Sequence, residues 1–534
     1  MAEDVLSSAQ IEALETAALG DDMLAVEAAA GAASTLAEPA AGAMPQAEPR
    51  AGGRLGSLRI GGVARNFVMV GGATALGQGA LVLAAPVLAR LYDPSAFGVL
   101  SLYTAILSVL LVACSLRFDF AIPISRDPDE AVHLTVLSIA IALVLSVGVG
   151  VVVLFGGRQI ADALGAPGLA GYLWVLPIAL FVAGISQALG SWGVYQRMFP
   201  AVGRMRAMQG LGQAVAQGSF GALRAGPFGL IAGDLVGRIA GTEQLIRPVG
   251  RAMRATGVTL AKTRRAAADR WSFARVMTLA SLLNALSLQV PFLLIPGAFD
   301  LGSSGQYFLS YRMLVLPASL ISAAVSQVFF GEAAHRRDDP RRLHDLAYNV
   351  AVSLFVVTIP MYVTVLVAGP ALITAVFGSQ WSDAGRYSQI MAPGLVLWGV
   401  ANPISALLLV GRRERESLMF TAAELTLKTL TLCVGAAVHS LTVGLVLLSA
   451  ATILINVAAL WRFLRVVPVR LRELVRPCMR IAALTAPPMA VVLAVGVVLP
   501  AATAVAAVFG FLAAFGLAAR LSPEPRALLS GAHD

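Results

Sequence analysis

Charged residues are scarce in this chain: only 13% of its 534 residues are Asp, Glu, Lys or Arg, whereas 58% are hydrophobic. Globular proteins in water carry roughly 25% charged residues. So much apolar surface cannot be buried in one soluble core, but the hydrocarbon layer of a membrane accepts it. The composition therefore excludes an ordinary soluble protein and predicts an integral membrane protein.

Cysteines and catalytic sequence patterns are also scarce. The three cysteines, Cys114, Cys433 and Cys478, lie on or beside apolar segments and lack the spacing of a metal or redox site. The sequence has no GxSxG, HExxH or Walker A motif, and its five histidines are dispersed. These absences weigh against an enzyme, and we expect no bound metal and no cofactor.

Basic residues are absent from the first 49 residues, which contain nine acids and many alanines. No positively charged stretch precedes an apolar one there, so this segment is not a signal peptide. Its composition is typical of a solvated, disordered tail, and a docking segment for a cytosolic partner is the alternative. We place this cytoplasmic tail at residues 1–60.

Long apolar runs are what the sequence has in abundance. Fourteen runs have about the 17–25 residues that a hydrocarbon layer of ~30 Å requires. They predict an all-α membrane protein with about 14 transmembrane helices, twelve in two parallel six-helix bundles and two at the C-terminus. The runs occupy residues 66–89, 97–116, 133–155, 171–192, 207–223, 227–246, 273–297, 306–330, 347–376, 387–410, 418–437, 441–461, 481–500 and 502–519.

The order of the runs predicts the division of the chain. A shift of 207 residues aligns Asp93 with Asp300 and Gly98 with Gly305, which suggests an internal repeat. After the tail, we expect an N-terminal bundle at 61–247, a basic cytoplasmic loop at 248–272, a C-terminal bundle at 273–465, a basic linker at 466–480, two extra helices at 481–520 and a cytoplasmic tail at 521–534.

Lys and Arg are distributed unevenly between the loops. With the N-terminus inside, 32 of the 39 fall on inside segments, four on outside loops and three within runs. This bias predicts that both termini are cytoplasmic. The stretch from Arg247 to Arg275 holds eight of them against one acid, Asp269, and we expect it to keep the junction of the bundles in the cytoplasm, near membrane lipids. Topology explains the basic charge, so we expect no nucleic-acid partner.

Charged side chains inside apolar runs are candidates for function, because each costs roughly 2.5–3.5 kcal/mol at the middle of a bilayer. Arg312 has no acid within one helical turn and is expected to face a cavity, where a cation suits an anionic group such as phosphate. Asp234 with Arg238 and Glu424 with Lys428 are spaced i and i+4, so each pair either serves a cavity or neutralises itself as a structural contact. The candidate substrate-binding residues are Arg312, Lys428, Arg117 and Arg238, and the candidate ion-coupling or paired acids are Asp119, Asp234 and Glu424.

Four segments resemble a known family. They are LARLYDPSAFGVLSLYTAIL at 88–107, SLRFDFAIPISRDPDEA at 115–131, PASLISAAVSQVFFGEAAHRR at 317–337 and FGSQWSDAGRYSQIMAP at 377–393. In this order they are similar to segments of Wzx-type polysaccharide exporters, the lipid-linked oligosaccharide flippases. That family shares a superfamily with multidrug and toxic-compound extruders and lipid II flippases.

The resemblance implies two six-helix bundles arranged as a V in the bacterial inner membrane. It also implies the flipping of an undecaprenyl-diphosphate-linked oligosaccharide from the cytoplasmic to the periplasmic leaflet, coupled to an ion gradient. A polysaccharide polymerase and a chain-length regulator are the partners that it implies. The acidic tail and the last two apolar runs depart from members with twelve helices.

Two other classes of protein stay open. A multidrug or other lipid exporter shares the architecture but would favour acidic cavity residues, of which the first half has few, mainly Asp119 and Asp234. A glycan polymerase or ligase would need a large outer loop with catalytic residues. The outside loops, none much longer than about sixteen residues, leave little room for one.

Overall fold

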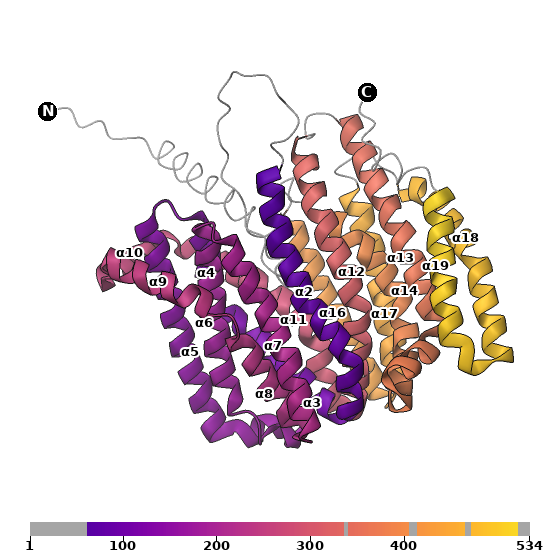
Figure 1. The fold of residues 1–534 in the computed structure, drawn as a ribbon, viewed down its shortest axis with the longest axis horizontal. Coiled ribbons are helices and arrows are strands. Elements are labelled where there is room, and N and C mark those ends of the chain that lie inside the picture. The colour runs from indigo at the N-terminus through magenta and orange to yellow at the C-terminus, as the bar shows by residue number, and fades with distance from the viewer. Residues whose placement is uncertain (1–60, 336–339, 405–413, 465–470, 522–534) are drawn as a thin grey trace.

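The computed structural model describes residues 61–335, 340–404, 414–464 and 471–521, and these ranges are helical without a β-strand. Most of the helices run up and down along one direction (Figure 1). The long helices are α2 (Gly61–Leu91), α3 (Pro94–Ala113), α5 (Pro128–Ala163), α6 (Val175–Tyr195), α7 (Phe199–Ala222), α8 (Gly226–Ile239), α11 (Trp271–Ala298), α12 (Leu301–His335), α13 (Pro340–Phe377), α14 (Ser382–Ile404), α16 (Glu414–Ala437), α17 (Leu441–Phe463), α18 (Leu471–Val498) and α19 (Thr503–Leu521).

Each predicted apolar run overlaps one of these long helices, but the run at 227–246 extends past the end of α8 into the next helix, and the run at 387–410 extends beyond the described part of α14. Ten helices are long and apolar enough to cross a membrane, judged by length and composition. Within the described residues, α7, α8, α12 and α14 do not meet that measure, and α8 has only 14 residues. The all-α membrane architecture is confirmed, whereas the count of fourteen crossings stays a prediction.

The helix boundaries near the middle of the chain differ from the predicted ones. Helix α7 begins at Phe199 rather than at 207, and Pro200 fits its first turn, where no backbone N–H is needed. Helix α8 ends at Ile239, and Gly241 follows with a left-handed φ of 77°, which few other residues adopt. The segment predicted as a basic loop is helical: it contains α9 (Glu243–Thr256) and α10 (Leu260–Asp269).

The predicted linker at 466–480 also differs. Helix α18 begins at Leu471, ten residues before the apolar run at 481, so most of that linker is the polar start of a helix. The tails predicted at 1–60 and 521–534 lie outside the described residues, apart from Leu521 at the end of α19. Their interpretation stays a prediction.

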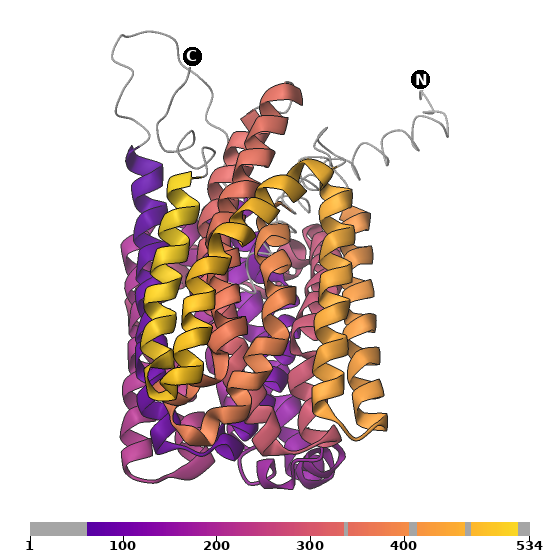
Figure 2. The ribbon, with the colours of Figure 1, turned by 90° about the vertical axis from the view of Figure 1, so that its right-hand side faces the viewer.

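The two halves of the chain lie side by side. Figure 1 shows the helices from α2 to α10 mostly on the left and those from α11 onward on the right. Helices α18 and α19 pack against α13 at the edge of the second half, which Figure 2 shows from the right-hand side. The exact division into domains stays a prediction.

The halves meet most closely where α3 crosses α12. A Cβ atom on Gly98 would lie 1.9 Å from the carbonyl oxygen of Leu301, and one on Gly305 would lie 1.8 Å from that of Pro94. The 207-residue shift relates these two contacts, since it converts Pro94 to Leu301 and Gly98 to Gly305. The repeated glycines therefore form a reciprocal contact in which two backbones touch.

Aromatic and polar side chains close the same end of the molecule. Trp381 is fully buried, and its indole N–H donates to the carbonyl oxygen of Ala89 at 2.8 Å. The side-chain amide of Gln380 donates to the same oxygen at 2.6 Å. Trp381 also packs edge-on against Phe97, with ring centroids 5.1 Å apart. At the turn between α2 and α3, the halves are thus joined by direct contacts.

Replacing Gly98 by alanine should lower the Tm of the purified full-length protein, because the new methyl group overlaps a backbone oxygen. Overpacking of this kind costs about 1–3 kcal/mol. Gly148 on α5 is the matched control, since a Cβ there meets nothing within 4 Å. Gly148→Ala should keep or raise the Tm, because alanine favours a helix by up to ~1 kcal/mol. Equal Tm values for the two variants would contradict the close crossing of α3 and α12.

Candidate functional site

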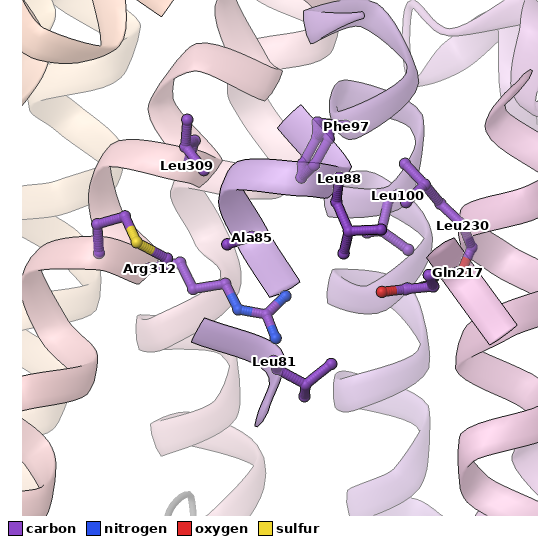
Figure 3. A pocket seen from close by; sticks show the side chains of 10 residues that line it. Leu81, Ala85, Leu88, Phe97, Leu100, Gln217, Leu230, Leu309 and Arg312 are labelled. Atoms are coloured by element: carbon purple, nitrogen blue, oxygen red, sulfur yellow. Dashed lines mark hydrogen bonds between the residues drawn. The ribbon is translucent and has the colours of Figure 1, made fainter. Parts of the chain in front are cut away.

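Arg312 points from α12 into a small pocket between the two halves (Figure 3). Helix α12 belongs to the second half, whereas most of the lining comes from α2, α3, α7 and α8 of the first half. Apart from Arg312 and Gln217, the lining side chains are apolar. They are Leu81, Ala85, Leu88, Phe97, Leu100, Leu230, Leu309 and Met313.

The guanidinium of Arg312 has unused hydrogen-bond donors. It lies 5.9 Å from the ring centroid of Phe308, a weak cation–π contact. Within the described residues it makes no hydrogen bond and no ion pair, although Asp234 lies within electrostatic range. A guanidinium carries five N–H donors in a planar fork that suits carboxylates and phosphates. The guanidinium can therefore hold an anionic group once the halves separate, because the pocket in this conformation, about 10 Å³, has room only for a water-sized molecule.

Asp234 and Arg238 form an ion pair on α8, at the i, i+4 spacing seen in the sequence. The Nε atom of Arg238 lies 2.7 Å from Oδ2 of Asp234, and its Nη2 atom lies 3.2 Å from Oδ1. Gln213 of α7 donates to Asp234 at 3.4 Å. The hydroxyl of Tyr103 on α3 is buried without a partner in the described part, and it lies within electrostatic range of this pair. Helices α3, α7 and α8 thus place a cluster of polar side chains among the apolar side chains of the first half.

Arg206 is a candidate that the sequence analysis missed. Its position before the apolar run at 207 suggested a loop, but the early start of α7 puts it in the second helical turn. A Cβ atom on Gly190 of α6 would lie 3.8 Å from its Nη2 atom. The side chain is half-buried, and it makes no hydrogen bond or ion pair to the described residues. Pro200, which favours a helix start, was the signal for it in the sequence.

Lys428 lies elsewhere. Its Nζ atom is 2.8 Å from Oε1 of Glu424 on the same helix, α16, and it donates to the backbone oxygen of Ser287 on α11 at 3.2 Å. These partners join α11 to α16, and Lys428 does not line the pocket of Arg312. A part for Lys428 or Glu424 in substrate binding or ion coupling stays a prediction.

Arg117 directly precedes the short helix α4 (Phe118–Ala121), and Asp119 lies within that helix. Arg117 adopts a left-handed φ of 58°, and its guanidinium carbon lies 4.7 Å from the ring centroid of Phe120. Asp119 is only 1% exposed and accepts a hydrogen bond from the hydroxyl of Ser115. Burial raises the pKa of the Asp119 carboxyl, although Arg117 and that hydrogen bond oppose the shift. Neither charged residue lines the pocket of Arg312.

Comparison with known families shows to which family this chain belongs. A family model described as polysaccharide biosynthesis protein matches residues 87–386, more than half of the chain. The chain belongs to this family. The resemblance to Wzx-type exporters that the four sequence segments indicated is thereby confirmed.

The named proteins that this chain resembles in sequence are distant relatives. The lipopolysaccharide biosynthesis protein WzxC of Escherichia coli is 26% identical over 62% of this chain and 67% of its own length. The succinoglycan biosynthesis transport protein ExoT of Rhizobium meliloti is 26% identical over 56% of this chain and 59% of its own length. The teichuronic acid biosynthesis protein TuaB of Bacillus subtilis is 26% identical, but over only 31% of this chain and 34% of its own.

Two solved structures of other proteins have a fold similar to that of this chain. The lipid II flippase MurJ in an inward closed conformation has a TM-score of 0.69 at 13% identity, covering 87% of this chain and all of MurJ. An inward-facing multidrug transporter of the MATE family has a TM-score of 0.61 at 15% identity, covering 73% of this chain and 94% of its own. At these identities the likeness establishes the fold, a multi-pass membrane transporter fold, and nothing about substrate.

The pH dependence of stability should reveal the buried carboxyl of Asp119. Its pKa is raised above the ordinary 3.8, so the protonated form stabilises the fold, and this stabilisation is lost as the pH rises from about 4 through the raised pKa. The Tm of the wild type should therefore fall relative to that of Asp119→Asn as the pH rises. A constant difference in Tm between the two chains from pH 4 to 8 would show that Asp119 does not titrate in this way.

The ion pair on α8 should be strongly coupled. Asp234→Ala leaves the charge of Arg238 without its partner inside the first half, and breaking a buried pair costs about 3–5 kcal/mol. The double variant Asp234→Ala, Arg238→Ala should lose less stability than the sum of the two single variants, as measured by Tm. Additive losses would indicate that the two side chains do not pair in the protein.

Proposed function

We propose that this family member is a flippase. It moves an undecaprenyl-diphosphate-linked oligosaccharide from the cytoplasmic to the periplasmic leaflet of the bacterial inner membrane for the synthesis of a surface polysaccharide. The observation that carries the proposal is Arg312, an unpaired guanidinium that faces a pocket between the two halves. A guanidinium binds phosphate and carboxylate groups, so it suits the diphosphate of such a substrate.

The position of the pocket supports transport by alternating access. Arg312 comes from one half and most of the lining from the other, so a movement of one half against the other changes which end reaches the site. The end near Gly98 and Trp381 is closed by direct contacts between the halves. In this arrangement the substrate reaches Arg312 from the opposite end, where α9 and α10 lie (Figure 1). The distribution of Lys and Arg predicts that this end faces the cytoplasm.

The polar cluster on α8 supports a role in ion coupling. Asp234 is buried, interacts with Arg238 at 2.7 Å and lies within electrostatic range of Arg312. Release of Asp234 from Arg238 when a diphosphate binds would free a carboxylate and so link the ion gradient to the state of the pocket. Asp119 and Glu424 remain alternative acids for this coupling.

The same pocket argues against a multidrug exporter of cationic compounds. Such an exporter would need an unpaired acid in the cavity, whereas Asp234 is engaged by Arg238 and the free charge belongs to Arg312. A polysaccharide polymerase and a chain-length regulator would act on the flipped product, and contact with them stays a prediction.

Replacing Arg312 by glutamine should abolish polysaccharide export in cells that depend on this protein, because the diphosphate loses its cationic partner. Binding of undecaprenyl diphosphate to the purified protein should weaken by roughly 10–100-fold, as expected for one charge-assisted pair of about 1.5–3 kcal/mol. Arg312→Lys should retain part of both activities.

Arg158→Gln is the matched control, since this exposed arginine near the end of α5 lies outside the pocket. It should leave export and binding unchanged, and all variants should reach the membrane in equal amounts. Lys428→Ala tests the second cation in the same assays: loss of export together with loss of binding would place it at the substrate. Normal export by Arg312→Gln would refute the assignment of the pocket.

A further inference from the structure

Helices α9 and α10 form a hairpin with one buried and one basic face. On α9, Leu245 and Val249 are buried in the first half. Arg247, Arg251 and Arg254 follow one another at spacings of four and three, so they share the opposite face, and all three are exposed. The helix is therefore amphipathic, with a narrow apolar stripe and a basic face.

Ion pairs fasten the hairpin to the first half of the protein. Lys262 of α10 lies 3.4 Å from Asp129, and Arg270 lies 2.8 Å from Glu130. Arg270 also donates to the backbone oxygen of Ile124 at 3.3 Å. These contacts hold the hairpin against the start of α5, so its outer face has a fixed direction.

Five arginines of the hairpin take no part in that attachment. They are exposed, and the described residues offer none of them a hydrogen bond or an ion pair. Three of them share one face of α9 and two are neighbours on α10, so like charges gather on both helices and attract an anionic partner. These residues, called the basic face below, are Arg247, Arg251, Arg254, Arg264 and Arg265.

The turn between the two helices exposes apolar side chains. Leu260 is 85% exposed at the start of α10, and Val258 beside it is also exposed. Trp271, at the start of α11, is 51% exposed. Apolar and Trp side chains next to a basic face are typical of helices that lie in the interface between lipid and water.

The place of the hairpin agrees with a membrane surface. Figure 1 shows α9 and α10 at the upper left edge of the molecule, beside α4 and the upper end of α5. Helix α5 is long and apolar enough to cross the membrane, and it exposes large apolar side chains such as Leu154 and Phe155. For a hairpin at the end of a helix that crosses the membrane we expect a position at the level of the phospholipid headgroups.

We propose that the α9–α10 hairpin is a binding site for anionic phospholipids of the surrounding leaflet. The basic face holds their phosphate groups, and Val258 and Leu260 insert into the boundary between headgroups and acyl chains. The acidic N-terminal tail of the same chain carries negative charge, as the lipid phosphates do. A tail in water, however, would leave the apolar side chains of Val258 and Leu260 uncovered. The site is separate from the pocket of Arg312.

Native mass spectrometry of the full-length protein in detergent tests the site, with phosphatidylglycerol and phosphatidylcholine as competing probes. Each surface arginine contributes a factor of roughly five to the affinity for anionic lipid. The variant Arg247→Gln, Arg251→Gln, Arg254→Gln should therefore lose roughly a hundredfold of the preference for phosphatidylglycerol. The control Arg158→Gln, Arg224→Gln, which changes exposed arginines outside the hairpin, should keep it. An unchanged preference in the triple variant would overturn the proposal.

A nitroxide at Leu260 tests the insertion of the turn. It is attached to Leu260→Cys in a chain with Cys433→Ser and Cys478→Ser and reconstituted in phosphatidylcholine vesicles with or without phosphatidylglycerol. With phosphatidylglycerol the label should become more accessible to oxygen and less accessible to a water-soluble relaxation agent. Greater accessibility to the water-soluble agent in both kinds of vesicle would exclude insertion.

Proteolysis distinguishes the lipid from the acidic tail. The tail contains nine acids and is cut by a Glu-specific protease. In detergent without anionic lipid, the tail of the wild type and of the triple arginine variant should be cut at the same rate. Faster cutting in the triple variant would show that the tail occupies the basic face, and it would overturn the assignment to lipid.

Discussion

The close crossing of α3 and α12 determines where the remaining parts of the candidate site lie. At Gly98 and Gly305 the two backbones touch, and no side chain fits between them. Gly305, Leu309 and Arg312 are spaced i, i+4 and i+7, so they share one face of α12. The face that packs on α3 at Gly305 therefore also directs Leu309 into the core of the first half and Arg312 into the pocket lined by its helices. A backbone contact two turns away thus positions the cation.

The charged residues inside the two halves differ in how their charges are neutralised. Asp234 with Arg238 and Glu424 with Lys428 each pair with a neighbour one turn away on the same helix. Such pairs travel with their helix, so they cost little when helices rearrange. Arg312 has no acid on its own helix within reach, and its nearest electrostatic partner, Asp234, belongs to the other half. An anion bound at Arg312 would therefore change the electrostatic interaction between Arg312 and Asp234, whereas the Glu424–Lys428 pair lies away from this pocket.

The sequence predicted those features that depend on residues close together in the chain. The apolar runs and the i, i+4 pairs are such local patterns, and the structure contains both; the repeat that aligns Gly98 with Gly305 spans 207 residues but is visible because the same residue types recur. Lys428 contacts Ser287, and Arg312 shares its pocket with residues of other helices. These contacts join segments that are far apart in the sequence, so no local spacing of residues predicts them. Arg206 was missed for another reason. The predicted run excluded Arg204 and Arg206 because they are charged, but α7 starts before them at Phe199, with Pro200 in its first turn.

The two ends of the molecule are built differently, and this difference limits how the halves move. At one end they are joined by backbone contacts and the buried Trp381, which all must separate for that end to open. At the other end only Arg270 separates α10 from α11, the first helix of the second half, and Glu130 holds Arg270 at 2.8 Å against the first half. The start of α11 is thus fixed to the first half, while its later part belongs to the second. Helix α11 contains Pro291 and Pro296, which remove backbone hydrogen bonds and permit a bend. These prolines therefore give α11 a place to bend when the halves rearrange while Arg270 holds its start against the first half.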